Sequence, residues 1–391
     1  MSDRSTVTDH KVQSAVALAD NGSEVLSTKA MFFCSGLATA AWAGIIPIIK
    51  ANTGIDDGTL GLLLLCLGMG AILSMPLAGA VATRLGCKLV MLVTLCVFSV
   101  VLMLLPLAQN TIQLVFLLIV FGFGIGATDC VMNIQAILVE KRANKTLMSG
   151  FHGFYSLGGI AGAGLMVVLL SAGISAFYAC VLIGLAMMAS LLVFHKGLLP
   201  FANPKEGPAF ALPHGAVLLI GLICFSFFLA EGTVLDWSGV YLTEYQQASH
   251  SKAVLGLFCF SITMTLGRLT GDKLTERLGA RLVLTLGGLL ASAGMFFAIA
   301  APDMHWALAG YALVGAGCAN VVPVMFSATG KQTSMPQAIA VPAVSTLGYI
   351  GVLAGPASVG QIAQYFSLPA ALYVIAVLIA VATLLSIRVK V

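Results

Sequence analysis

A short basic sequence motif that occurs twice limits the possible folds of this chain more than any other feature. The first copy reads Arg84-Leu85-Gly86-Cys87-Lys88-Leu89-Val90, and the second, nearly half the chain later, reads Arg277-Leu278-Gly279-Ala280-Arg281-Leu282-Val283. Each copy lies between apolar stretches of about 20 residues, which is the length that a helix needs to cross the ~30 Å hydrocarbon core of a bilayer. The repeat therefore predicts an all-α membrane protein built from two similar halves.

The composition supports a membrane protein. Hydrophobic residues make up 59% of the 391 residues and charged residues only 9%, which leaves too little polar surface for a soluble chain. The net charge of +4 implies no nucleic-acid partner, because the basic residues concentrate in turns, where they orient helices. The nine cysteines form no Cys-x-x-Cys and no Cys/His cluster, so we expect no disulfide, no metal and no cofactor.

Hydropathy predicts twelve transmembrane helices and a division into two bundles. The predicted spans are 29–50, 58–82, 89–108, 112–138, 147–171, 175–195, 215–242, 253–274, 281–300, 306–328, 337–364 and 368–387. We expect residues 1–27 to form a flexible cytoplasmic tail, since they are polar and lack a signal-peptide pattern. The proline-rich segment 196–214 is expected to be a cytoplasmic linker between six-helix bundles at 28–195 and 215–391.

The distribution of lysine and arginine predicts the orientation. When successive turns are assigned to alternate sides, one side receives only Lys50 and Lys252, and the other side receives all the remaining Lys and Arg residues. By the positive-inside rule both termini then face the cytoplasm.

A second internal sequence repeat relates the fourth and tenth spans. Gly124-x-Gly126-x-x-Asp129 parallels Gly315-x-Gly317-x-x-Asn320, and glycines at this spacing let neighbouring helices approach closely. We interpret this repeat as evidence that the two halves align helix by helix. Asn320 and Pro323 are also expected to interrupt or bend the tenth helix beside a cavity.

Two parallel six-helix halves with basic, glycine-containing turns after the second and eighth spans resemble the major facilitator superfamily (MFS) of secondary transporters. The resemblance implies an MFS fold of two pseudo-symmetric six-helix bundles around a central cavity. The first turn resembles the superfamily pattern Gly-x-x-x-Asp-Arg-x-Gly-x-Lys, with Thr83 in place of the acid, whereas Glu276 occupies that position in the second copy. The resemblance implies a gating role for Arg84, Lys88, Asp272, Glu276, Arg277 and Arg281, with a weaker charge relay in the first half.

Shorter sequence segments resemble particular branches of that superfamily. Gly122-x-Gly124-x-Gly126-x-x-Asp129 followed by Asn133 is similar to the fourth helix of the fucose-permease-like branch, where an acid and an asparagine face the cavity. Asn144-Lys145-Thr146, the segment His152–Gly158, Ala230-Glu231-Gly232 and Asp236-Trp237 resemble YbjJ-type inner-membrane transporters of bacteria. The first-helix acid of fucose permease is missing here, and Ser35, Thr39 and Trp42 are the polar or aromatic side chains of that helix.

Acids inside the predicted spans are the candidates for proton coupling. An ionised side chain at the bilayer centre costs about 2.5–3.5 kcal/mol, so Asp129, Glu231 and Asp236 need a cavity or a partner. An acid that is alternately wet and dry can take up and release a proton. We rank Asp129 first and Glu231 second. Asp236 is nearer the helix end and fits a gate or an interfacial residue. The alternative for Asp129 is that it only pins its helix through Thr or Asn hydrogen bonds.

His152 opens the fifth span and is expected either to hydrogen-bond Asp129, as a titrating pair, or to bond a backbone carbonyl at the helix end.

The predicted cavity lining points to an uncharged solute. The substrate-binding candidates are Trp42, Asn133, Tyr155, Asn320, Tyr349 and Trp237, the last of which also fits an interfacial aromatic. We see no deep Arg or Lys among them, so we expect a neutral polar solute such as a sugar rather than an anion.

Three functions fit these features. The leading hypothesis is proton-coupled symport of a small polar solute across the bacterial inner membrane by a monomer, whose partners are the solute, protons and the lipid bilayer. The rival is proton-driven efflux of amphipathic or cationic compounds, and the third is a non-transporting membrane sensor or scaffold. The sequence contains no P-loop and no metal spacing, so we predict that the protein is not an enzyme.

Overall fold

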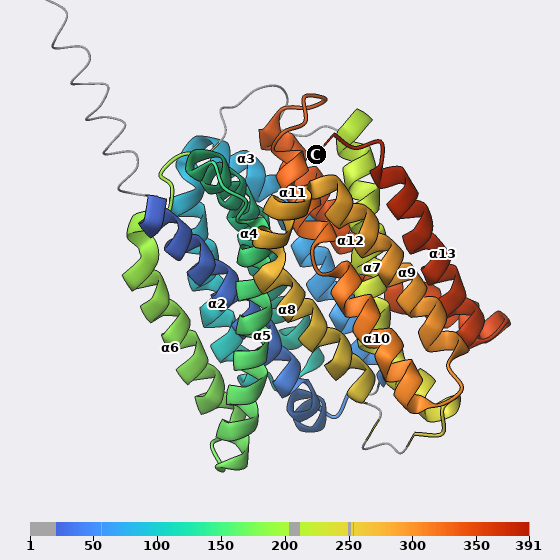
Figure 1. The fold of residues 1–391 in the computed structure, drawn as a ribbon. Helices are drawn as coiled ribbons and strands as arrows, with labels where there is room; N and C mark the ends of the chain where they lie inside the picture. Colours follow the sequence, from blue (N-terminus) through green and yellow to red (C-terminus); the bar gives the residue numbers. More distant parts are fainter. Residues whose placement is uncertain (1–20, 56, 203–211, 249–251, 253, 391) are drawn as a thin grey trace, which may run out of the picture.

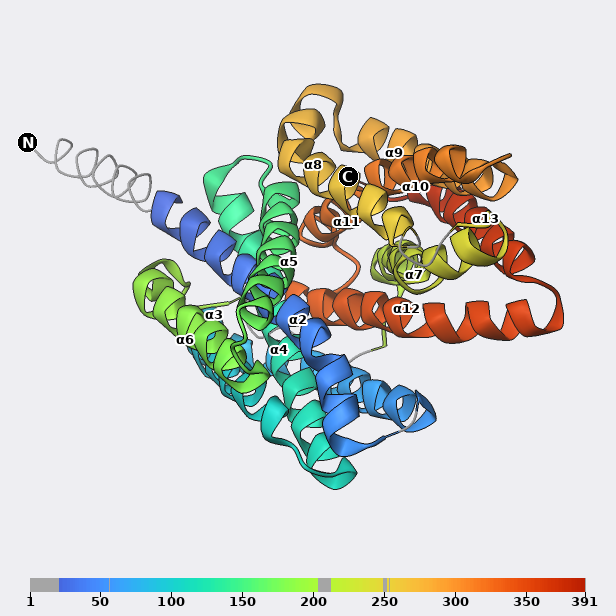
Figure 2. The same cartoon turned by 90° about the horizontal axis from the view of Figure 1, so that it is seen from below.

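The structure, a computed structural model, describes residues 21–55, 57–202, 212–248, 252 and 254–390. Within these residues every regular element is a helix. The chain forms two side-by-side groups of helices, with α2 to α6 in one and α7 to α13 in the other (Figures 1 and 2).

The helices agree closely with the predicted spans. The first group contains α2 (Asn21–Thr53), α3 (Asp57–Leu104), η1 (Leu105–Leu107), α4 (Thr111–Ala143), α5 (Met148–Ser171), α6 (Ala176–Phe194) and η2 (His195–Gly197). The second contains α7 (Gly215–Glu244), α8 (Leu255–Leu278), α9 (Ala280–Ala300), α10 (Met304–Cys318), α11 (Val321–Thr329), α12 (Gln337–Tyr365) and α13 (Leu368–Ser386). Ten helical segments in the described chain are long and apolar enough to cross a membrane. α3 holds two predicted spans, and the more polar α8 holds another.

The repeated basic turns are built on glycines with positive φ. Gly86 has φ 80° and ψ 160°, and Gly279 has φ 82° and ψ 147°, a conformation that is nearly restricted to glycine. After Gly86 the backbone amides of Cys87 and Lys88 donate to the carbonyls of Phe201 and Leu199, at 3.3 and 2.7 Å. The start of the predicted linker is therefore hydrogen-bonded to the first turn; residues 203–211 of the linker lie outside the described part.

The predicted tail ends earlier than residue 27. Residues 1–20 lie outside the described part, but α2 already begins at Asn21. Glu24 forms an ion pair with Arg142 of α4 at 3.0 Å, and the Ser27 hydroxyl donates to the Phe194 carbonyl at 2.5 Å. These contacts hold the polar first turns of α2 against the bundle, which hydropathy alone does not detect.

Helix packing corrects the predicted alignment between the glycines of the fourth and tenth spans. Gly122 lies against Leu67 in the first part of α3 and Gly124 lies against Phe98 in its second part. In the other half Gly315 lies against Phe260 of α8, and Gly317 lies against Ala291 of α9. Gly122 and Gly124 are thus the counterparts of Gly315 and Gly317, with the same offset that joins Arg84 to Arg277. The predicted match of Asp129 with Asn320 is off by two residues.

The break in the tenth span is confirmed. α10 ends at Cys318, α11 begins at Val321, and Asn320 lies between them with Pro323 in the first turn of α11. The corresponding α4 is continuous through this region, so the two halves differ here.

The two groups of helices meet along α5 with α8, α3 with α12, and α11 with α4 and α5. Many of these contacts lie toward one end of the molecule, where the turns with Arg84, Lys145, Arg277 and Lys331 are found; we call it the basic end. It is the upper end in Figure 1, beside the described C-terminal residues.

Candidate functional site between the two halves

A polar cluster lies where α4, α5, α7, α8 and α12 converge. Its members are Asp129 of α4, Tyr155 and Ser156 of α5, Glu231 of α7, Arg268 of α8 and Tyr349 of α12. Tyr155 is within electrostatic range of Asp129, Glu231 and Arg268, and Tyr349 is within range of Tyr155 and Asp129. The Tyr155 hydroxyl also donates to the Thr39 hydroxyl of α2 at 3.4 Å. The fold thus brings four of the predicted site residues together.

Arg268 is the link between the halves in this cluster. Its Nη2 lies 3.1 Å from Oε1 and 3.4 Å from Oε2 of Glu231, which forms an ion pair within the second half. Its Nη1 donates to the Ser156 hydroxyl of the first half at 3.1 Å, and its Nε donates to the Ala319 carbonyl at 3.4 Å. One guanidinium therefore connects a buried acid, the broken tenth span and the opposite bundle.

The expectation of no deep Arg or Lys is wrong, because Arg268 lies in the middle of α8 and only 5% of it is exposed. The same rule that singled out acids inside spans applies to an arginine inside a span. Arg268 had been counted among the basic residues of the turns, although the predicted eighth span, 253–274, contains it.

Asp129 has no charged partner in the described part of the chain, and no side chain there hydrogen-bonds its carboxylate. The Asn133 amide donates instead to the backbone carbonyl of Asp129 at 2.9 Å. It is the adjacent Thr128 that joins α4 to α3, through the Thr94 hydroxyl at 2.9 Å. The alternative in which Asp129 only pins its helix thus finds no hydrogen bond to support it.

His152 does not pair with Asp129. Its ring lies 5.2 Å from the ring of Phe32 and 5.8 Å from that of Phe326, measured between centroids. Its Nε2 is buried, and the described residues offer this atom no hydrogen-bond partner. Although the turn between α4 and α5 is short, α5 packs mainly on α2 and hardly touches α4. His152 therefore faces the aromatic side chains of α2 and α11.

The other substrate-binding candidates, Trp42, Asn133, Asn320 and Trp237, are not members of the polar cluster. Trp42 is only 6% exposed and packs on Phe121 within the first half, with ring centroids 5.8 Å apart. Asn133 and Asn320 are buried, and each has a side-chain oxygen without a partner among the described residues. Trp237 packs against Gly360 of α12 with its buried Nε1–H likewise unpartnered, and its neighbour Asp236 is exposed.

Among the gating candidates, only Asp272 forms a hydrogen bond between the halves in the part of the chain that the structure describes. Its Oδ2 accepts the backbone N–H of Gly150, in the first turn of α5, at 2.9 Å. A carboxylate at a helix N-terminus is favoured by the positive end of the helix dipole. Arg281 donates instead to the carbonyls of Ile387 and Val389, at 2.7 and 3.3 Å.

The expected charge relay is not formed in the described residues. Arg84, Glu276 and Arg277 are exposed and Lys88 is half-buried, and none of the four forms an ion pair there.

Comparison with known proteins places these features in a family. The family model described as "Major Facilitator Superfamily" matches residues 30–334 and 220–390. An uncharacterized MFS-type transporter of Yersinia pestis is 44% identical over 358 residues, which cover 91% of this chain and 93% of that protein. Among solved structures, the Escherichia coli fucose:proton symporter FucP is similar with a TM-score of 0.76 and 16% identity, covering 94% of this chain and 98% of that one. The human organic anion transporter MFSD10 is similar with a TM-score of 0.78 and 16% identity, covering 93% and 99%.

Proposed function

Because the chain belongs to the major facilitator superfamily, an MFS-fold family of multi-pass membrane transporters and not of enzymes, we propose that it carries a small polar solute by proton-coupled alternating access. The observation that carries this proposal is the position of Asp129, an acid with no charged partner among the described residues, near the Glu231–Arg268 ion pair at the junction of the two halves. FucP, whose fold is similar, is a fucose:proton symporter, which supports a proton as the coupling ion.

The chemistry of the cluster suits proton exchange. Burial favours the neutral form of a carboxyl group, and a nearby cation favours the charged form. Glu231 has such a cation, whereas no cation of the described residues forms an ion pair with Asp129, so we assign the exchangeable proton to Asp129. Glu231 then stays ionised and holds Arg268, which in turn donates a hydrogen bond to Ser156 of the first half.

The charge balance favours an uncharged solute. Arg268 is neutralised by Glu231, so the cluster carries one negative charge when Asp129 is ionised and none when Asp129 is protonated. An anionic solute has no unpaired cation to bind in either state. Tyr155, Tyr349 and Ser156 offer hydroxyls, so we propose a polyhydroxylated solute of sugar-like size, taken up by symport.

We further propose that the basic end faces the cytoplasm of a bacterial inner membrane, with both termini on that side and the monomer as the working unit. Lys50 lies in the last turn of α2 and Lys252 shortly before α8 begins, both away from the basic turns, in keeping with that orientation.

The test begins with a thermal-shift screen of the purified protein against sugars, polyols, nucleosides, amino acids and cationic dyes, because a ligand of the folded state raises its stability. The best ligand is then used for uptake into proteoliposomes with and without a pH gradient. We expect Asp129→Asn to bind the solute and exchange it between the two sides, but to lose accumulation driven by the pH gradient.

The matched control is Glu244→Gln, which neutralises an exposed acid at the end of α7 and should accumulate solute like the parent protein. Gradient-driven accumulation by Asp129→Asn would refute Asp129 as the proton carrier. Stabilisation by cationic dyes alone, with dye efflux driven by the gradient, would favour the rival function.

A further inference from the structure

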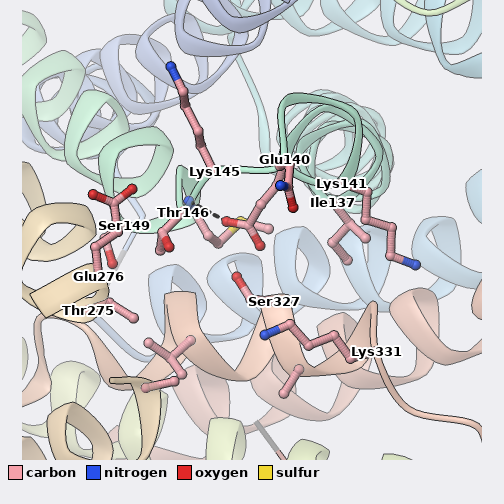
Figure 3. A pocket seen from close by; sticks show the side chains of 15 residues that line it. Ile137, Glu140, Lys141, Lys145, Thr146, Ser149, Thr275, Glu276, Ser327 and Lys331 are labelled. Atoms are coloured by element: carbon pink, nitrogen blue, oxygen red, sulfur yellow. Dashed lines mark hydrogen bonds between the residues drawn. The ribbon is translucent and has the colours of Figure 1, made fainter. Parts of the chain in front are cut away.

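A cavity lies at the basic end, apart from the polar cluster. It has a volume of about 570 Å³ and is lined by residues from the end of α4, the α4–α5 turn, the start of α5, the α8–α9 turn and α11. Figure 3 shows the lining side chains. This volume is within the ~300–1,000 Å³ range of small-molecule sites. Both halves of the molecule contribute walls, so the cavity is complete only while their basic ends are together.

The lining combines cations with hydroxyls. Lys331 of the second half reaches toward the middle of the cavity near Ser327, while Lys141 and Lys145 of the first half are exposed and extend outward from its walls (Figure 3). Such long side chains change rotamer readily, so lysines from both halves can contact one anion.

Two acids also line the cavity, and they are not equivalent. The Glu140 carboxylate accepts the backbone N–H groups of Leu147 and Met148, each at 2.9 Å, and is thereby engaged at the start of α5. Glu276 is exposed and forms no ion pair in the described part of the chain. The cavity therefore offers three cations for an anionic group and a carboxylate that can accept hydrogen bonds from hydroxyls.

A buried hydroxyl in this wall lacks a partner. Thr275 is 8% exposed, and its Oγ1 has no hydrogen-bond partner among the described residues. Leaving a buried polar group unsatisfied costs about 1–3 kcal/mol. The Thr275 Oγ1 is covered as it stands, and a rotation of this side chain toward the cavity would let a bound ligand satisfy it. Thr146, Ser149 and Ser327 add further hydroxyls to the same walls.

We propose that this cavity binds the phosphate monoester of a small polyhydroxylated metabolite and that the bound molecule inhibits transport. The phosphate lies on Lys331 together with a lysine of the first half, since lysine binds phosphate as a mobile point charge. The hydroxyls of the ligand lie near Glu276 and Thr275. A ligand that spans both halves binds only the conformation in which their basic ends meet, and it therefore opposes the opening that transport requires.

The probe is glucose 6-phosphate, compared with glucose and with inorganic phosphate, on the full-length protein in lipid-free detergent. We expect glucose 6-phosphate to raise the midpoint of thermal unfolding more than either control compound. Lys331→Gln should weaken its binding about tenfold or more, as expected for loss of a charged hydrogen bond. Lys273→Gln removes an exposed cation of α8 that does not line the cavity and should leave the affinity unchanged.

Thr275→Val separates a binding role from a structural one. Removal of an unpartnered buried hydroxyl leaves the fold intact or more stable, so a purely structural role predicts no change in affinity. We expect the affinity for glucose 6-phosphate to fall several-fold, while Asp129→Asn retains it because the transport cluster is not involved.

Equal stabilisation by glucose and glucose 6-phosphate, or unchanged binding in Lys331→Gln, would overturn the proposal. Stabilisation by phosphatidylglycerol nanodiscs without any by glucose 6-phosphate would overturn it in favour of a lipid headgroup.

Discussion

At the scale of single residues, Arg268 and Glu231 form a pair whose removal has calculable consequences. The two side chains are only 7% and 18% exposed, and removing one partner of a buried pair costs about 3–5 kcal/mol because the other charge loses its counter-ion. We expect Arg268→Gln and Glu231→Gln each to lower the midpoint of thermal unfolding in detergent. The double variant should recover most of the loss, and simple additivity of the two losses would contradict the pairing.

The pH dependence distinguishes the two single variants. The carboxyl group left by Arg268→Gln can take up a proton, whereas the guanidinium left by Glu231→Gln cannot lose one. The stability deficit of Arg268→Gln should therefore shrink as the pH falls, because the neutral acid needs no counter-ion. The deficit of Glu231→Gln should stay constant over the same range, as measured by thermal unfolding at several pH values.

At the scale of elements, the two repeated turns offer a matched pair of substitutions. Gly86 and Gly279 share a positive φ, so alanine at either position is strained by about 1–3 kcal/mol. Around Gly279 there is open space, but a Cβ at Gly86 would collide with the backbone of Pro200. We expect Gly86→Ala to lower the unfolding midpoint more than Gly279→Ala, and equal shifts would show that the contact with the 198–201 segment is unimportant.

At the scale of the whole molecule, Asp272 is expected to bias the balance between the two transport conformations. Its bond to Gly150 joins α8 to α5, and loss of a charge at a helix N-terminus costs about 1 kcal/mol, or about fivefold in population. Ala338 of α12 is buried against Gly79 of α3, at a distance from that bond. A cysteine introduced by Ala338→Cys therefore becomes accessible to an alkylating reagent when the basic ends separate. Asp272→Asn should raise the alkylation rate of this cysteine about fivefold. The rate is measured by mass spectrometry of the peptide that contains residue 338.

Asp303→Asn is the control for this experiment. Asp303 also accepts backbone N–H groups at a helix start, those of His305 and Trp306, but within one half of the molecule. Its loss should leave the alkylation of the Ala338 cysteine unchanged. A similar increase in both variants would indicate general loosening of the fold rather than separation of the halves.

The helices, their duplication and the concentration of basic residues at one end can all be predicted from the amino-acid sequence. These properties depend on the local length and hydropathy of each segment, and the predicted spans lie close to the observed helices. The sequence also singled out Asp129, Glu231, Tyr155 and Tyr349, because polar groups inside spans are costly wherever they lie. It located the glycine turns at 86 and 279, since the repeated motif marks both.

Which of these groups contact one another depends on how the helices pack. Arg268 lies 37 residues from Glu231 and 112 from Ser156 along the chain, and Asp272 lies 122 from Gly150. Such contacts depend on the faces that packed helices turn toward one another, which hydropathy does not encode in a chain that is apolar nearly all round. For the same reason His152, close to Asp129 in sequence, faces Phe32 and Phe326 instead.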